Sequence, residues 1–213
     1  MKIAIIGAGN VGSALGKGWI KRGHQVVFGI RDASSPKSEK ASREIEGAEF
    51  QEVQSACDGA DVVVVTTPAD VVADLVPLMG PLEGKVVIDT TNAIRMRPEP
   101  YATGYHAIVA LSKDAAVVKC FNTTGFENMA NPSYHQESPV PHSVSLDMFM
   151  AGGNSEAKKV ARQLALDLGF EACWDFGGED KVELLEKFAL SWINLAILQG
   201  HGREIAFKVI RRQ

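Results

Sequence analysis

Cysteine is scarce in this sequence, and the few cysteines form neither a disulfide framework nor a metal site. Cys57, Cys120 and Cys173 are scattered along 213 residues without a CxxC pair. An odd and scattered set of cysteines is typical of proteins in a reducing compartment. We therefore predict a cytoplasmic protein, and we expect the three thiols to lie in the core rather than to act as nucleophiles.

The chain also lacks a basic stripe and a long hydrophobic run. Its formal net charge is −4, and acidic and basic residues are mixed throughout. Such a balance provides no positively charged patch that would bind nucleic acid or an anionic lipid surface. The densest apolar run, at residues 188–198, is far shorter than the roughly 20 residues that cross a bilayer. We expect neither nucleic acid nor a membrane among the partners, which leaves a small-molecule substrate.

Residue sets that mark hydrolytic and metal-dependent enzymes are missing as well. There is no HExxH, no cluster of metal ligands, no evident Ser/His/Asp order and no lysine in a recognisable catalytic context. The five histidines are scattered, and only His135 and His142 fall in a segment that can approach a substrate, although a surface position explains them more simply. The sequence therefore predicts no metal and identifies no catalytic residue.

Apolar runs alternate with segments of helical spacing. The runs at residues 2–6 and 61–66 have the continuous apolar character of strands buried on both faces of a sheet. Further strands are expected at residues 25–28, 49–51, 85–89, 115–121, 148–151 and 171–174, and helices at residues 10–21, 68–78, 105–111 and 155–168. This order predicts an α/β fold of the Rossmann type, with a doubly wound, mainly parallel sheet.

Two segments depart from this alternation. Residues 126–144 are polar, contain three prolines and have no convincing period, which predicts a long loop. Residues 180–211 are expected to form a C-terminal helical extension, apolar on nearly all sides from 188 to 198 and bent near two glycines. Such a helix needs cover, and a second subunit is one source of it.

A GxGxxG run, GAGNVG from Gly7 to Gly12, lies between the first strand and the first helix. In that context the first glycine makes the turn, the second lets the backbone approach a pyrophosphate, and the third permits close helix packing. The amino end of the helix offers N–H donors and a positive dipole to the same pyrophosphate. A tight turn without function is the plainer alternative, but the context favours a dinucleotide site.

Basic and hydroxyl side chains follow the second strand, about 20 residues beyond the glycine run, where such folds read the adenosine ribose. Arg31 is followed by Ser34, Ser35 and Lys37. A guanidinium, hydroxyls and an ammonium group form the donor set that a ribose phosphate requires, which favours NADP. Asp32 leaves NAD open, because a carboxylate that faces the ribose would favour the unphosphorylated cofactor.

Polar residues also follow three other strands. They are Thr66-Thr67-Pro68, Thr90-Thr91-Asn92 and Asn122-Thr123-Thr124. In an open parallel sheet, ligands bind in the crevice outside the carboxyl ends of the strands. Each group alone is equally well explained as a helix or turn cap, but the three together favour a nicotinamide site.

Several segments resemble the NADPH-dependent reductases of the deazaflavin coenzyme F420, over essentially the whole length of the chain. They are IAIIGAGNVGSALG, FGIRD, VVVVTTP, KCFNTTGFENM, LLEKFALSWINLA and GHGREIAFKVIRR. The resemblance implies that residues 8–11 contact the pyrophosphate, that Ile30, Arg31 and Lys37 surround the ribose phosphate, and that residues 122–124 wall the ring site. In archetypal archaeal members a histidine and a proline stand where this chain has Asn122 and Gly125, so F420 and a flavin both stay open as acceptors.

Together, the motifs and the resemblance predict an NADPH-dependent oxidoreductase that transfers a hydride between NADP(H) and coenzyme F420 or a flavin. We expect residues 1–213 to form a single NADP-binding domain, with a helix at 179–213 packed on the domain or on a partner subunit of a homodimer. A non-catalytic NADP(H) sensor and a reductase of a small carbonyl or imine are the alternatives. The predicted cofactor-binding residues are Gly7, Ala8, Gly9, Asn10, Val11, Gly12, Ile30, Arg31, Ser35, Lys37, Thr67, Pro68, Asn92, Asn122 and Thr123.

Overall fold

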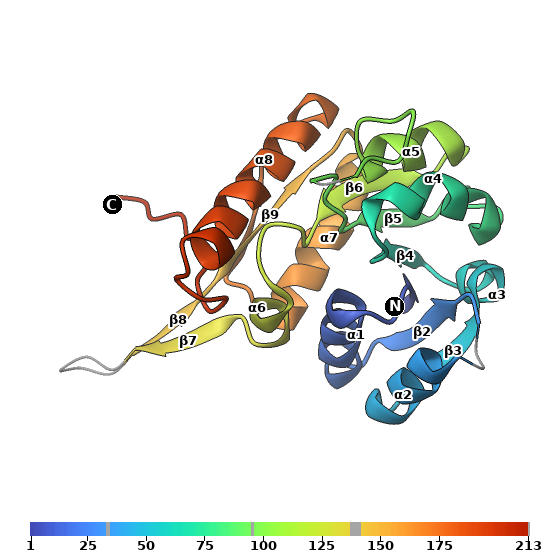
Figure 1. Ribbon diagram of the computed structural model, residues 1–213, viewed down its shortest axis with the longest axis horizontal. Coiled ribbons are helices and arrows are strands. Elements are labelled where there is room, and N and C mark those ends of the chain that lie inside the picture. Colours follow the sequence, from blue (N-terminus) through green and yellow to red (C-terminus); the bar gives the residue numbers. More distant parts are fainter. Residues whose placement is uncertain (33–34, 95, 137–141, 213) are drawn as a thin grey trace.

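The computed structural model describes residues 1–32, 35–94, 96–136 and 142–212, and eight strands in this part of the chain form one sheet (Figure 1). The strands are β1 (Lys2–Ile6), β2 (Gln25–Ile30), β3 (Glu49–Glu52), β4 (Val62–Val65), β5 (Val86–Asp89), β6 (Ala116–Cys120), β9 (Asp147–Ala151) and β10 (Ala172–Asp175). Their order is β10-β9-β6-β5-β4-β1-β2-β3. All neighbours are parallel except β6 and β9. The predicted Rossmann-type, mainly parallel sheet is therefore confirmed.

Helices cover both faces of this sheet. They are α1 (Asn10–Lys21), α2 (Pro36–Glu44), α3 (Val53–Asp58), α4 (Val72–Leu75), α5 (Gly104–Leu111), α6 (Phe126–Ala130), α7 (Ser155–Leu168) and α8 (Val182–Ile193). Alternate β1 residues face opposite ways. Ile3 and Ile5 belong to the core cluster that includes side chains of α1 and α7, whereas Ala4 and Ile6 belong to the cluster that includes side chains of α3, α4, α5 and α8. Side chains buried on both faces explain why the strands read as continuous apolar runs. The sequence analysis did not anticipate α3.

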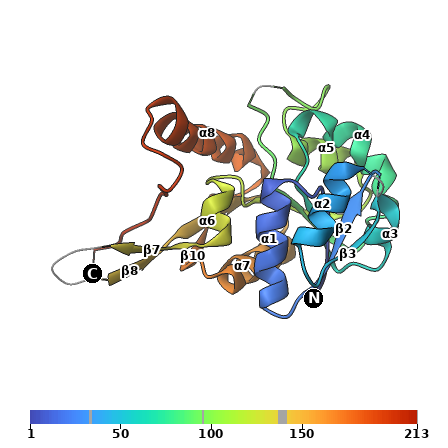
Figure 2. The ribbon, with the colours of Figure 1, turned by 60° about the horizontal axis from the view of Figure 1, so that its bottom comes forward.

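The expected long loop at residues 126–144 is wrong for the part that the structure describes. That segment contains α6 and a separate antiparallel hairpin of β7 (Ser133–Gln136) and β8 (His142–Ser145), which projects from the body in Figure 2. The Tyr134 hydroxyl donates to Asn128 Oδ1 at 2.6 Å and so ties the hairpin to α6. Strands of only four residues, with prolines before and between them in the sequence, give too little periodicity to be recognised.

The expected helix at residues 180–211 is confirmed only in its first half. After α8 and a π-helical turn, Asn194–Leu198, the described residues 199–212 contain no helix. Gly200 and Gly202 have φ angles of +75° and +84°, a conformation that glycine adopts without strain and that ends a helix. The remaining chain, which we call the C-terminal arm (residues 199–212), returns beside β8 and β9, where Lys208 Nζ donates to Ser145 O at 2.9 Å.

The three cysteines are buried with free thiols, as expected for core residues. Burial raises the pKa of Cys57 to about 12, although the nearby Lys85 ammonium partly opposes this effect.

Among the helices in the part of the chain that the structure describes, none combines the length and the apolar character that crossing a bilayer requires.

Candidate functional site

Glycine is required at each of the three glycine positions of the GAGNVG loop for a different structural reason. Gly7 has a φ of +112°, in the region that side chains disfavour, and so makes the turn after β1. A Cβ atom at Gly12 would overlap the Gly7 carbonyl oxygen and lie 2.8 Å from Thr66 Oγ1, so α1 approaches β1 only because that atom is missing. At Gly9 no described atom lies within 4 Å of such a Cβ, so this residue faces open space. The loop therefore combines tight packing on one side with backbone exposure on the other.

The amino end of α1 follows this loop directly. Its first hydrogen bond within the helix runs from Ser13 N to Gly9 O at 2.8 Å, and the Gly9 cap has no side chain to donate or accept. The amides of Asn10, Val11 and Gly12 precede that bond and have no partner within the helix. Asn10 is exposed and Val11 is half-buried. This end of the helix can therefore offer unpaired amides and a positive dipole to an anion.

A pocket of about 630 Å³ opens beside the glycine loop. Its lining comprises Ile6, Gly7, Ala8, Gly29, Ile30, Arg31, Asp32, Ser35, Ser38, Val53, Thr67, Pro68, Val71, Asp74, Leu75 and Leu78. Seven of the residues predicted to bind the cofactor are among them, and the volume lies within the range of small-molecule sites. Ser38 and the apolar wall formed by Val53, Leu75 and Leu78 also line the pocket, but they were not predicted from the sequence. That wall comes from α3 and from the helical turns after β4, which carry no recognisable motif.

The end of β2 and the start of α2 form the polar side of this pocket. Ser35 caps α2 by accepting from Ser38 N at 3.2 Å, and both serine hydroxyls donate to the Asp32 carbonyl, at 3.1 and 2.7 Å. Arg31 is exposed at the mouth of the pocket. Arg31 and Asp32 both line the pocket, so a ribose phosphate and a bare ribose each have a candidate partner there. Ser34 and the side chain of Lys37 lie outside the described part of the structure.

The threonines that end the strands divide into two kinds. Thr66 Oγ1 donates to Gly7 O at 2.8 Å and Thr90 Oγ1 donates to Val65 O at 2.9 Å, so both hydroxyls stabilise the strand ends themselves. Thr67 Oγ1, in contrast, is buried and has no hydrogen-bond partner in the described structure, although its residue lines the pocket. A buried hydroxyl without a partner is costly, and a bound ligand would satisfy it.

Asn92 and Asn122 join the ends of β5 and β6. Asn92 Nδ2 donates to Asn122 O at 2.8 Å, and Asn122 Nδ2 donates to Asn92 Oδ1 at 3.0 Å. Asn122 Oδ1 is buried without a described partner. Before it, Phe121 has a φ of +61°, a strained conformation for a residue with a side chain, and such strain is concentrated at functional sites. The side chain of Thr123 does not join the Asn92–Asn122 pair, because its hydroxyl contacts Met148 Sδ at 3.7 Å.

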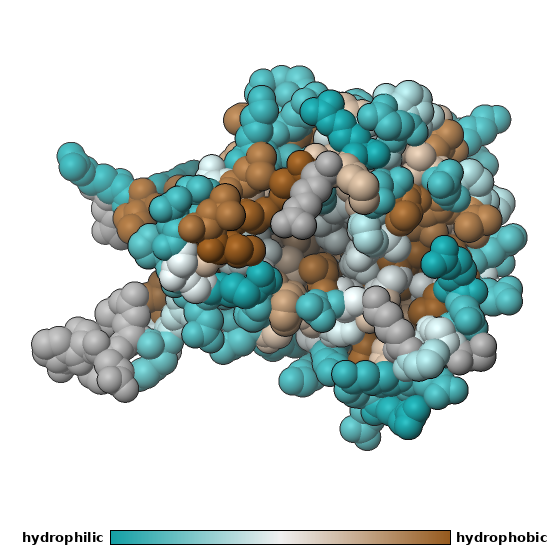
Figure 3. Space-filling view, in the orientation of Figure 1, coloured by the Kyte–Doolittle hydropathy of each residue, from teal (hydrophilic) through white to brown (hydrophobic). Residues whose placement is uncertain are grey.

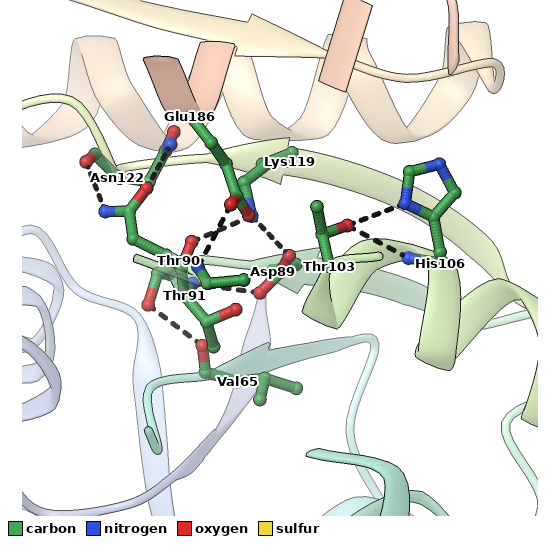
Figure 4. Close-up of polar contacts among 11 residues, drawn as sticks. Val65, Asp89, Thr90, Thr91, Thr103, His106, Lys119, Asn122 and Glu186 are labelled. Carbon is green, nitrogen blue, oxygen red and sulfur yellow. Dashed lines mark hydrogen bonds and ion pairs between the residues drawn. The ribbon is translucent and has the colours of Figure 1, made fainter. Parts of the chain in front are cut away.

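A buried ion triplet that was not predicted from the sequence joins β5, β6 and α8 (Figure 4). Lys119 Nζ is 2.7 Å from Asp89 Oδ2 and 2.7 Å from Glu186 Oε1, and the lysine is fully buried. Burial alone would lower the pKa of Lys119, but the two carboxylates outweigh it and raise the pKa above its ordinary value. Asp89 and Lys119 are register partners on β5 and β6. The sequence offered a signal for the pairing of Asp89 with Lys119, because each charge stands in an otherwise apolar strand. It offered no such signal for Glu186, which lies on α8, far along the sequence.

The two histidines singled out in the sequence are not brought to this pocket. His135 is exposed on β7, and neither its strand nor β8 contributes to the lining. The side chain of His142 is outside the described part. In the described ranges, no group of three or more His, Cys, Asp and Glu side chains is arranged to hold a metal ion.

Residues 2–93 match the sequence model of the family described as NADP oxidoreductase, coenzyme F420-dependent. The match includes the glycine loop, the Arg31 turn and the strand ends at Thr67 and Asn92. It confirms, for this part of the chain, the resemblance to F420-dependent NADP oxidoreductases seen in the sequence.

Solved structures give the same fold. A candidate F420-dependent NADP reductase from Arthrobacter sp. FB24 has a TM-score of 0.83 at 24% identity, covering 99% of this chain and all of that one. A hypothetical protein from Sinorhizobium meliloti has a TM-score of 0.69 at 25% identity, covering 100% and 96%. A reductive aminase from Aspergillus terreus, solved with NADPH and ethyl-5-oxohexanoate, has a TM-score of 0.66 at 17% identity. That match covers 93% of this chain but only 62% of the aminase.

Proposed function

We propose that this protein is an NADP(H)-dependent oxidoreductase that transfers a hydride between the nicotinamide ring and a planar acceptor, coenzyme F420 or a flavin. The observation that carries the proposal is the pocket beside the glycine loop, which gathers Gly7, Arg31 and Thr67 in one cavity of about 630 Å³. The match of residues 2–93 to an F420-dependent NADP oxidoreductase family supports it.

The pocket divides into parts that suit the parts of NADP(H). The amides at the start of α1 suit the pyrophosphate, and the guanidinium of Arg31 with the hydroxyl of Ser35 suits a ribose phosphate. The apolar wall of Val53, Leu75 and Leu78 suits the adenine ring. We call Thr67, Asn92 and Asn122 the strand-end cluster. Only Thr67 lines the pocket itself, and the proposal extends the nicotinamide from Thr67 toward Asn92 and Asn122 at the ends of β5 and β6. Two of these residues carry buried polar atoms without a described partner, Thr67 Oγ1 and Asn122 Oδ1.

Little acid or base chemistry is needed for this reaction. NADPH supplies a hydride and becomes NADP⁺, while the acceptor takes up that hydride and one proton from water. The protein has to hold the two rings at about 3 to 3.5 Å and exclude competing geometries. The strand-end cluster performs this by position, which agrees with the lack of an evident acid–base pair in the sequence.

Stopped-flow measurement of NADPH oxidation against a panel of acceptors tests the proposal. The panel contains F420, FMN, FAD, a ferric chelate and a cyclic imine. Rapid oxidation with F420 or a flavin is expected. Binding of NADPH without oxidation by any acceptor would instead support the non-catalytic sensor, and turnover with the imine alone would support a small-imine reductase.

The same proposal includes a homodimer in the cytoplasm. Apolar side chains gather over the carboxyl end of α8 in Figure 3, where Leu195, Ile197 and Leu198 are 36%, 51% and 73% exposed. Contiguous exposed apolar surface of this kind marks an interaction site. A second copy that covers these residues would bury them, and light scattering of the purified protein measures whether the chain is dimeric.

A further inference from the structure

The ion triplet of Asp89, Lys119 and Glu186 carries a net charge. It consists of two carboxylates and one ammonium group, all buried. Each carboxylate also accepts a backbone amide, since Thr91 N donates to Asp89 Oδ1 at 2.9 Å and Ala93 N donates to Glu186 Oε2 at 3.0 Å. These donors stabilise the ionised carboxylates. The triplet therefore holds one net negative charge.

The backbone groups bonded to the triplet do not cancel this charge, because they are neutral. Lys119 Nζ also donates a hydrogen bond to Thr91 O at 2.7 Å. The triplet is thus bonded to Thr91 and Ala93, the two residues that flank Asn92 in the strand-end cluster. Figure 4 shows the side chains of Asp89, Lys119 and Glu186 converging, with Glu186 reaching toward the other two from α8.

We propose that Glu186 is a specificity-determining residue that biases the strand-end cluster toward the oxidised, positively charged nicotinamide ring over the reduced, neutral ring. This inference rests on the proposed function, which brings the nicotinamide to Asn92. A buried charge is screened weakly by solvent and salt, so it acts over several ångströms on a cationic ring. Lys119 neutralises Asp89 on the sheet, and Glu186, supplied by α8, adds the unbalanced charge.

The proposal assigns two separable roles to Glu186. Its hydrogen bond to Ala93 N holds the turn in place, and loss of this role weakens the binding of both dinucleotides together. Its charge distinguishes the two oxidation states, and loss of this role changes the ratio of their dissociation constants. A purely structural role of Glu186 would leave the ratio of the two dissociation constants unchanged, so this ratio distinguishes the two roles.

The experiment compares Glu186→Gln with Glu186→Asp by titration calorimetry with NADP⁺ and with NADPH. Glu186→Gln removes the charge, and the affinity for NADP⁺ relative to NADPH is expected to fall about tenfold. Glu186→Asp keeps the charge on a shorter side chain, so both affinities fall while their ratio stays within about twofold. Glu183→Gln, at an exposed position on the same helix, is the matched control and leaves both values unchanged.

An unchanged ratio in Glu186→Gln, or an equal change of ratio in Glu186→Asp, would overturn the inference. If Glu186→Gln does not fold, Asp89→Asn removes one charge from the same triplet and is expected to give the same change of ratio. Failure of the proposed function is recognised separately in the unmodified protein, which would then either bind neither dinucleotide or bind NADPH without oxidising it with any acceptor.

Discussion

Gly9 and Gly12, three residues apart, illustrate how single positions control this site. A side chain at Gly12 would collide with the Gly7 carbonyl, whereas one at Gly9 would enter open space. The same substitution should therefore damage the fold at one position and the ligand site at the other. The sequence predicted both glycines from a motif, but only the structure separates their roles.

Replacing each glycine by alanine tests this separation. Gly12→Ala forces α1 away from β1, and we expect a loss of stability of about 1–3 kcal/mol together with loss of dinucleotide binding. Gly9→Ala should cost about 1 kcal/mol or less as a poorer helix cap, yet weaken NADPH binding clearly. Urea unfolding and calorimetric titration measure the two effects. Gly153→Ala, where only Glu179 Oε2 lies within 4 Å, at 3.9 Å, should change neither.

Arg31 decides between the two nicotinamide dinucleotides if its guanidinium holds the ribose phosphate. Loss of a charge-assisted hydrogen bond to a phosphate costs about 1.5–3 kcal/mol. Arg31→Ala should therefore raise the Michaelis constant for NADPH about 10- to 100-fold and leave that for NADH nearly unchanged. Steady-state kinetics with both cofactors measure this. Arg43→Ala on α2 removes an exposed arginine paired with Glu39 and is the control; an unaltered NADPH preference in Arg31→Ala contradicts the assignment.

Cys57 gives a pH dependence of stability with a definite sign. Burial raises its pKa from 9.0 to about 12 in the folded protein, so above pH 9 the unfolded chain loses the proton first. Ionisation then stabilises the unfolded state, and this contribution to stability is lost as the pH rises. Between pH 9 and 10 the loss is about 1 kcal/mol. Urea unfolding at both pH values should show a smaller decrease in Cys57→Ala than in the unmodified protein.

At the scale of elements, α8 and the C-terminal arm are positioned by contacts from distant parts of the chain. Glu186 on α8 reaches Lys119 on β6, and in the arm Ile205 O accepts from Trp192 Nε1 at 2.6 Å and from Asn128 Nδ2 at 2.8 Å. These contacts replace the helical hydrogen bonds that the sequence pattern predicted for residues 199–211. Beyond Gly202 the arm is held by hydrogen bonds with side chains rather than by helical backbone hydrogen bonds.

Asn128 is the residue on which this arm depends. Its amide donates to Ile205 O and to Thr124 Oγ1 and accepts from Tyr134. Asn128→Ala removes the acceptor of the Tyr134 hydroxyl, the donor to Thr124 Oγ1 and one of the two donors to Ile205 O, which should cost about 2 kcal/mol or more and expose the arm to trypsin at Arg203 and Lys208. Limited proteolysis and thermal unfolding measure both effects. Asn131→Ala, at an exposed position beyond α6, should resemble the unmodified protein.

At the scale of the whole molecule, the parallel strands place every predicted ligand-binding segment at one edge of the sheet. Strands β1, β2, β4, β5 and β6 are neighbours and parallel, so their carboxyl ends lie together although they are spread over 120 residues of sequence. The apolar end of α8 lies outside this arrangement and remains uncovered. In the proposed homodimer, a second copy of the chain would cover this apolar surface.

A charge placed in that uncovered surface tests the homodimer. Leu198→Glu introduces a carboxylate where the side chain is 73% exposed. If a second copy covers it, burial of an unpaired charge should convert the dimer to monomer in light scattering. Leu166→Glu, 42% exposed on α7, is the matched control and should leave the mass unchanged. A dimer in both variants would place the interface elsewhere.

The fold class and the glycine loop could be predicted from local sequence patterns, because buried parallel strands and a GxGxxG turn are recognisable without knowledge of distant residues. The sequence also predicted the polar strand ends, since each directly follows its strand. Only the tertiary structure decided the apolar wall of the pocket, the direction of Thr123 and the partner of Lys119. These depend on which side chains meet across the sheet, and Glu186 meets Lys119 from 67 residues away only because α8 packs against β9, the neighbour of β6 in the sheet.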